Sequence, residues 1–425
     1  MPLTGENEPD VRRTRLANGI RVVSERMPDA RSVTTGFWVA VGGRDEPAEL
    51  AGASHFLEHL VFKGSASQNA REIAESVDAL GGEMNAFTSR EHTAYYTRLP
   101  ADELSFGLEL LTAVLAQPAL RPHEIDAERD VILEELAMSE DTPDDKVHSL
   151  LAASVFPDHP LGREVLGDEA TVEALGREEI NTFFGEHYRP ANIVIAAAGR
   201  LDHDEVIAGV SAFLEGVDAG EAPKRSEPID APVALAVEHR PTEQAHLTLG
   251  WRAIDQRDPD RFALAIANQA FGGGLSSRLF QEIREDRGLA YSVYSAASLY
   301  TDSGLFMIYA GTAPSKIDEV LDLIDAEVDK LVADGITERE LRVASGYLVG
   351  ALLLNLEDSG SRMGRLARGE LASGKALTVD EQVERIRAVT LEDAHRVMQR
   401  VLTGPKTLAA VGPFDESAFS ARAGG

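Results

Sequence analysis

The sequence predicts an α+β fold made of two similar halves, each a mostly antiparallel sheet with helices packed on one face. The same order of strand and helix patterns occurs twice along the chain. A stretch at 217–232 with three prolines, several charges and no apolar periodicity separates the two runs, which is typical of a linker. A chain of 425 residues can hold two or more domains. We therefore expect a first domain at 1–216, a linker at 217–232 and a second domain at 233–425.

The first half opens with a predicted hairpin at 14–23, in which Asn18 and Gly19 form a type I′ turn. A strand is expected at 32–41, because this segment is rich in β-branched and aromatic residues. The periodicity of the remaining segments predicts a helix around 54–63, a helix at 71–80, two strands within 83–99, helices at 102–116, 122–138, 146–156 and 178–188, a strand at 192–198 and a helix at 203–215.

The second half repeats this order. The patterns predict paired strands within 234–252, helices at 261–271 and 276–285, strands at 291–299 and 305–311, helices at 317–332, 337–355, 361–371 and 379–402, and a closing strand at 407–411. The similarity of the halves is one of element order and not of residue identity.

The motif HFLEH, which begins at His55, suggests a metal site. His55 and His59 are four residues apart and so share one face of a helix, where both imidazoles can reach one metal ion. Glu58 falls near that face, where a carboxylate can act as the general base. Ser54 is the expected N-cap, and Gly64 is expected to end the helix. Two surface histidines are the alternative, but the helix is too apolar to face solvent.

Composition excludes several functions. The chain has no cysteine, so any zinc must be bound by His, Asp or Glu. Its net charge of -30 argues against nucleic acid and against anionic membrane surfaces as partners. The N-terminal segment has no apolar signal core, and the longest apolar run, at 347–356, is too short to span a bilayer. A cytoplasmic protein is therefore expected.

A catalytic zinc site usually has three protein ligands and one open position. Candidates for the third ligand lie on the helix predicted at 122–138. Glu128 and Glu135 are seven residues apart and share a face, whereas Glu134 points about 100° away. Spacing alone does not choose among these three carboxylates, and each could equally be a solvated side chain on the helix surface.

The chain resembles the pitrilysin-type peptidases, whose zinc motif is followed 76 positions later by a glutamate ligand. Glu135 stands 76 positions after His59. The resemblance extends to ERDVI from residue 128, GGEMNAFT from residue 81, GGLSSRLF from residue 273 and RGLAY from residue 287. It points in particular to short two-domain bacterial enzymes related to the mitochondrial processing peptidase. It implies that His55, His59 and Glu135 bind one Zn²⁺ and that Glu128 supports these ligands.

The resemblance also implies substrate-binding groups. Asn85, Ala86, Phe87 and Thr88 would form an exposed edge strand beside the zinc, to which a peptide adds as a further strand. Phe62 would line the pocket for the residue after the cleaved bond, although its position fits a core phenylalanine equally well.

Arg284 and Tyr291 match an arginine–tyrosine pair that reaches the active site from the second half of such peptidases. The tyrosine hydroxyl can donate to a developing oxyanion, and the arginine can hold a substrate carbonyl. Without the resemblance, Arg284 would be interpreted as a surface arginine and Tyr291 as a tyrosine packed in the sheet.

Together these observations predict a zinc metalloendopeptidase that cleaves unfolded peptides or presequence-like segments. The second domain, which has no zinc motif, is expected to close a chamber formed by a homodimer or by a heterodimer with a related subunit. The alternative is a non-catalytic partner or scaffold subunit, but such chains usually lack part of the ligand set that is complete here. A metal-dependent hydrolase of non-peptide substrates fits less well, because small substrates need no edge strand.

Overall fold

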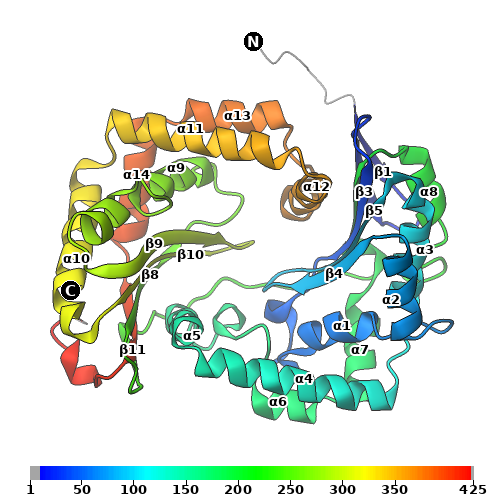
Figure 1. Ribbon diagram of the computed structural model, residues 1–425, viewed down its shortest axis with the longest axis horizontal. Coiled ribbons are helices and arrows are strands. Elements are labelled where there is room, and N and C mark those ends of the chain that lie inside the picture. Colours follow the sequence, from blue (N-terminus) through cyan, green and yellow to red (C-terminus); the bar gives the residue numbers. More distant parts are fainter. Residues whose placement is uncertain (1–9, 423–425) are drawn as a thin grey trace. The chain divides into compact units, whose positions relative to one another are not determined.

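A computed structural model describes residues 10–422 and divides them into two compact units (Figure 1). Unit 1 contains 10–136, Glu164–Arg225 and Leu353–Thr378. Unit 2 contains Ala137–Arg163, Ser226–Leu352 and 379–422. The division expected at 217–232 differs from these units in two segments, because one helix of each half of the sequence packs on the sheet formed by the other half.

The sheet of unit 1 has six strands in the order β1-β2-β6-β3-β5-β4. Neighbouring strands are antiparallel, except for the parallel pair β2 and β6. The strands are β1 (Val11–Arg15), β2 (Arg21–Arg26), β3 (Ser32–Val39), β4 (Glu83–Thr88), β5 (Thr93–Pro100) and β6 (Ile193–Gly199). Strand β4 is therefore an edge strand, paired only with β5.

Both faces of this sheet are buried, as the alternation along β6 shows. Ile193, Ile195 and Ala197 pack into the core formed with the helices of the first half. Val194 and Ala196 pack against the other face, together with residues of α12 (Ser359–Ser373). The helices of the first face are α1 (Ala53–Val61), α2 (Ala70–Ala79), α3 (Leu104–Ala116), α4 (Pro122–Asp141), α6 (Glu169–Ala174), α7 (Arg177–His187) and α8 (His203–Val210). Figure 1 shows α12 on the side of the sheet opposite α3 and α8.

The sheet of unit 2 has the order β7-β11-β8-β10-β9, with only β7 and β11 parallel. Its strands are β7 (Leu235–His239), β8 (Ala245–Ala253), β9 (Ala290–Leu299), β10 (Gly304–Thr312) and β11 (Lys406–Gly412). One face packs against α9 (Arg261–Phe271), α10 (Ile317–Asp334), α11 (Glu338–Asn355), α13 (Val379–Ala388) and α14 (Leu391–Leu402). The other face packs against α5 (Pro143–Val155) of the first half.

The two sheets confirm the expectation of two similar halves. Apart from β1, strands β2, β6, β3, β5 and β4 stand in the same order and direction as β7, β11, β8, β10 and β9. Each sheet has a layer of helices on one face, as predicted, and one further helix, α12 or α5, also packs on its second face. Their placement has a simple cause: strands that are apolar on both sides need a cover on both sides.

Three local predictions are also corrected. The turn at 16–19 is not type I′: Gly19 has φ +105, but Asn18 is not among the residues with positive φ. Instead, the Gly19 N–H donates to the Leu16 carbonyl and the Leu16 N–H to the Ile20 carbonyl, which makes a three-residue loop with a glycine bulge. The helix predicted at 379–402 is two helices, since Thr390 and Asp393 form a capping box that starts α14.

The helix predicted at 276–285 is also different in the structure: Phe280–Glu285 form a π-helix.

Among the described residues, no helix has the length and apolar character needed to cross a bilayer.

Candidate metal centre

Helix α1 carries the HFLEH motif and is fixed at its start by a carboxylate from an earlier turn. Gly52, the N-cap, has φ +94, a conformation that favours glycine, and offers no side chain to cap the helix. The buried carboxylate of Glu46 accepts hydrogen bonds from the backbone N–H of Gly52 at 2.8 Å and of Ser54 at 2.6 Å. Glu46 thus satisfies N–H groups at the positive end of the helix dipole. The expectation that Ser54 is the N-cap is wrong, because the helix already begins at Ala53.

The end of α1 also differs from the expectation. Phe62 is the C-cap, two residues before Gly64. Phe62 packs edge-to-face on Tyr95 with ring centroids 5.8 Å apart, and it lies partly buried against the core of unit 1.

Three side chains from α1 and α4 converge. The imidazole Nε2 atoms of His55 and His59 lie 3.7 Å and 3.6 Å from the same carboxylate oxygen of Glu135. The two rings are 4.7 Å apart between centroids. Among the described residues, these three form the only group of His, Asp or Glu side chains arranged to hold a metal ion. Glu134 and Glu128 do not belong to this group, so Glu135 is the carboxylate that the structure places beside both imidazoles.

The donor set fits zinc. Zinc bonds of about 2.0–2.2 Å in a tetrahedral arrangement separate neighbouring ligand atoms by roughly 3.3–3.5 Å. The Nε2–oxygen separations of 3.6 Å and 3.7 Å need only a small contraction to meet this geometry. All three side chains are half-buried, so solvent can reach the group. Two imidazoles and one carboxylate with an open position form the ligand set of a catalytic zinc site.

The histidines are prepared for binding in different ways. Burial, with a smaller contribution from His59, lowers the pKa of His55 to about 4, so its imidazole is neutral at neutral pH, as a metal ligand must be. The Nδ1 atom of His59 lies 3.0 Å from Glu128, which directs its Nε2 towards Glu135. Glu128 is itself buried and forms an ion pair of 2.6 Å with Lys63.

Glu58 lies between the histidines and the edge strand β4. Burial raises the pKa of Glu58, and the hydroxyl and backbone N–H of Thr88 oppose this rise by hydrogen bonding to its carboxylate. A carboxylate with a raised pKa is a better proton acceptor near neutral pH. The structure therefore brings a base next to the group that can hold a metal.

Strand β4 has a free edge on which a peptide can pair. The backbone N–H of Ala86 donates to the side-chain oxygen of Asn85 at 2.8 Å, as expected for an N–H that faces away from β5. Asn85 and Phe87 are exposed and point to one side of the strand, while Ala86 and Thr88 point to the other and are half-buried.

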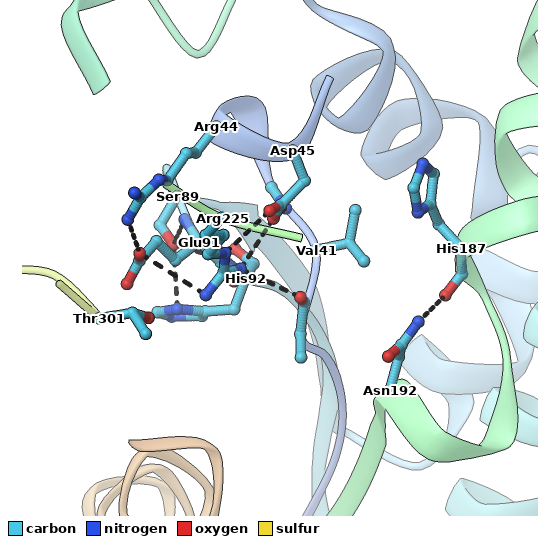
Figure 2. A network of polar contacts seen from close by, with 12 residues as sticks. Val41, Arg44, Asp45, Ser89, Glu91, His92, His187, Asn192, Arg225 and Thr301 are labelled. Atoms are coloured by element: carbon cyan, nitrogen blue, oxygen red, sulfur yellow. Dashed lines mark hydrogen bonds and ion pairs between the residues drawn. The ribbon is translucent and has the colours of Figure 1, made fainter. Parts of the chain in front are cut away.

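The hairpin of β4 and β5 is anchored at its turn by buried ion pairs (Figure 2). Arg225 binds both carboxylate oxygens of Asp45 at 2.8 Å and donates to the Glu91 backbone carbonyl at 2.8 Å. Arg44 pairs with the Glu91 carboxylate at 2.6 Å. Arg225, the last residue of this part of unit 1, thus holds the turn that carries β4.

Arg284 and Tyr291 lie in unit 2. Tyr291 is at the start of the edge strand β9 and is 78% exposed. The Arg284 guanidinium lies 5.7 Å from the Tyr291 ring and 4.8 Å from the Phe280 ring, so the pair is formed within its own unit.

Sequence reasoning missed Glu46 and Lys63. Lys63 follows His59 by four residues, a helical spacing that could have suggested a shared partner. Glu46 had no such signal, because it lies in an irregular segment and reaches α1 only through the fold.

Comparison with known proteins finds similarity over nearly the whole chain. Residues 21–169 match the family described as Insulinase (Peptidase family M16), and residues 174–345 match Peptidase M16 inactive domain. A zinc protease of Streptomyces coelicolor, called uncharacterized, is 43% identical over 420 residues, covering 96% of this chain and 91% of the relative. Another, from Bacillus subtilis, is 37% identical over 404 residues, covering 95% and 98%. The crystal structure of a peptidase M16 inactive domain from Pseudomonas fluorescens has a TM-score of 0.89 at 21% identity, covering 95% and 98%.

Proposed function

Because this chain belongs to peptidase family M16, the insulinase family, we propose that it is a zinc metalloendopeptidase that cleaves unfolded peptides or presequence-like segments. The observation that carries the proposal is the convergence of His55, His59 and Glu135, with Glu58 beside them. Zinc, when bound, polarises a carbonyl oxygen and lowers the pKa of a water molecule to about 7.

The chain's own residues supply the proton transfers. Glu58 removes a proton from the attacking water and delivers it to the amine nitrogen of the leaving fragment. Its raised pKa suits both steps, because the carboxylate must gain and then lose a proton near neutral pH. Glu128 and Lys63 keep His59 in the orientation that presents Nε2.

Strand β4 is the proposed binding site for the peptide substrate. A peptide that pairs with the backbone at 85–88 forms hydrogen bonds that need no particular side chains. Thr88 touches the Glu58 carboxylate, so a strand added along this edge runs past the base. This arrangement favours a peptide over a small substrate.

Further parts of the proposal concern the assembly. The second domain at 233–425, in which the described residues contain no second metal group, would close a chamber around the substrate. The Tyr291 hydroxyl would donate to the oxyanion, and Arg284 would hold the substrate carbonyl. We also propose a homodimer, or a heterodimer with a related subunit, in the cytoplasm.

A non-catalytic subunit is the second candidate function. It is suggested by the similar Pseudomonas fluorescens structure, which is named a peptidase M16 inactive domain. The complete set of two histidines, a ligand glutamate and a base favours the enzyme.

The proposal is tested by incubating the purified chain with an unfolded peptide library, and mass spectrometry then identifies any products. Cleavage should stop after treatment with a chelator and return when zinc is restored. A zinc-loaded chain that leaves every peptide intact would support the non-catalytic subunit instead.

A further inference from the structure

Arg368 on α12 has no counter-charge. Its neighbours Arg362 and Arg365 both pair with the buried carboxylate of Glu25. Within residues 10–422, by contrast, the Arg368 guanidinium forms no ion pair and no hydrogen bond. Burial lowers the pKa of Arg368, and no carboxylate offsets this effect. In a chain with 71 acidic and 41 basic residues, a partly desolvated arginine without a carboxylate is a feature to explain.

The guanidinium lies against the indole ring of Trp38. Its central carbon is 5.9 Å from the ring centroid. Gly364, one turn earlier on α12, leaves room for it, because a Cβ at this glycine would be 3.0 Å from Nη1. Arg368 nevertheless remains exposed, so an incoming group can reach it.

Trp38 belongs to an aromatic group that extends to the edge strand. Phe87 on β4 and Trp38 on β3 both oppose Ala94 of the intervening strand, and their rings meet edge-to-face with centroids 5.3 Å apart. The His92 ring lies 5.2 Å from Trp38 and 5.8 Å from Phe87. Because Ala94 is small, these rings pack into a continuous apolar floor from Arg368 to the free edge of the sheet, in which Trp38 is buried and Phe87 is exposed.

This floor lies on the face of the sheet opposite the metal centre. Trp38 and Ala94 pack with α12, whereas α1 packs on the other face. A peptide that pairs with β4 points alternate side chains to the two faces. Every second substrate side chain therefore lies on the same face as Phe87 and Arg368.

We propose that Arg368 and Phe87, which rest on Trp38 and His92, form a subsite for a carboxylate-bearing side chain of the peptide that pairs with β4. This inference rests on the proposed function. An arginine stacked on an aromatic ring keeps its N–H groups available for a carboxylate, which they bind in a bidentate manner. The carboxylate supplies the missing counter-charge, while the apolar floor accommodates its methylene groups. The net charge of -30 attracts basic peptides in general. The preference for an acidic side chain therefore applies only at those peptide positions whose side chains face Arg368.

The test uses unstructured peptides that are identical except for one residue, Glu or Gln, placed in turn at each position around the cleaved bond. C-terminally amidated versions separate a side-chain carboxylate from the terminal one. Affinity is measured on the zinc-loaded Glu58→Gln protein, and kcat/KM is measured on the protein with Glu58. We expect a preference for Glu over Gln of about tenfold at alternate positions, as for a charge-assisted hydrogen bond.

Variants of Arg368 test whether this residue causes the preference for Glu over Gln. Arg368→Met should bring the Glu/Gln ratio to about one, Arg368→Lys should retain part of it, and Arg368→Glu should favour a Lys peptide over the Gln peptide. Arg71→Met, at an exposed arginine of α2, is the matched control and should keep the wild-type ratio. Circular dichroism verifies the fold of each variant.

The outcomes separate this inference from the proposed function. Equal affinity for Glu and Gln peptides at every position, or an unchanged preference in Arg368→Met, would overturn the subsite even if the enzyme cleaves peptides. A preference that depends on Arg368 in binding, without any cleavage by the protein with Glu58, would support the subsite and refute the peptidase. A preference that vanishes on amidation would also overturn the subsite, because it would place the terminal carboxylate at Arg368.

Discussion

His59 and Glu128 are joined by a contact of 3.0 Å between Nδ1 and a carboxylate oxygen, and this contact fixes which nitrogen of the imidazole faces Glu135. Lys63 holds the other oxygen of Glu128 at 2.6 Å. The orientation of one ligand therefore depends on a chain of two charged residues outside the group of three.

Removing Lys63 should weaken zinc binding. In Lys63→Met, Glu128 loses the ion pair that fixes its carboxylate, so we expect zinc affinity to fall by about tenfold, at the lower end of the range for partners of metal ligands. Competition with a fluorescent chelator measures the affinity directly. Lys63→Arg is the control and should retain most of it; equal affinities in Lys63→Met and the wild type would show that Lys63 has no role at the metal centre.

Glu46 should stabilise the fold through the start of α1. Glu46→Ala leaves the N–H groups of Gly52 and Ser54 without their buried acceptor, and we expect a loss of about 1–3 kcal/mol in the free energy of unfolding. Urea denaturation with zinc removed measures this loss. Glu49→Ala, at an exposed position nearby, should change stability by less than about 0.5 kcal/mol. Equal stability of the two variants would show that Glu46 does not stabilise the start of α1.

The pKa of His92, lowered to about 4 by burial and by Arg368 and Arg225, predicts a dependence of stability on pH. Below its ordinary pKa of about 6.5, the unfolded chain binds a proton that the folded chain accepts only near pH 4. The free energy of unfolding should therefore fall as the pH drops from 6.5 to 4, by at most about 3 kcal/mol from this residue.

Comparing the wild type with His92→Asn over this pH range isolates the contribution of His92 from that of other histidines. The stability difference between the two proteins should shift against the wild type as the pH falls. A difference that stays constant with pH would mean that His92 titrates normally in the folded state.

Tyr291→Phe tests the proposed oxyanion role of unit 2. If the hydroxyl donates to charge that develops during the reaction, kcat should fall by about tenfold or more while KM changes little. Steady-state kinetics on one peptide distinguishes the two parameters. A rise in KM alone would assign Tyr291 to substrate binding.

The sequence predicted the fold class and most elements, because apolar periodicity and turn residues are local signals. It also predicted α1 and α4 as the helices of the metal centre, since the spacing within HFLEH is a property of one helix. It did not predict that α5 and α12 exchange places between the halves. Their apolar faces are visible in the sequence, but the sheet that each face covers is decided by tertiary packing.

The same limit explains the details of the site. The choice of Glu135 over Glu134 needed either the resemblance or the geometry, since both lie with Glu128 on the same 20-residue helix. The hydrogen bonds between Glu46 and the start of α1 and the ion pairs around Arg225 join residues outside any one helix or strand. No periodic pattern in the sequence predicts such contacts. Arg362, Arg365 and Arg368 recur every three residues in the sequence, and only the structure separates Arg368 from Arg362 and Arg365, which are both paired with Glu25.

The proposed mechanism is tested most directly by measuring zinc content and peptide cleavage together in Glu58→Gln. If His55, His59 and Glu135 hold the metal while Glu58 moves the proton, the variant should retain about one zinc per chain and lose cleavage by about a hundredfold or more. Cleavage at the wild-type rate by the zinc-loaded variant would show that Glu58 is not the general base.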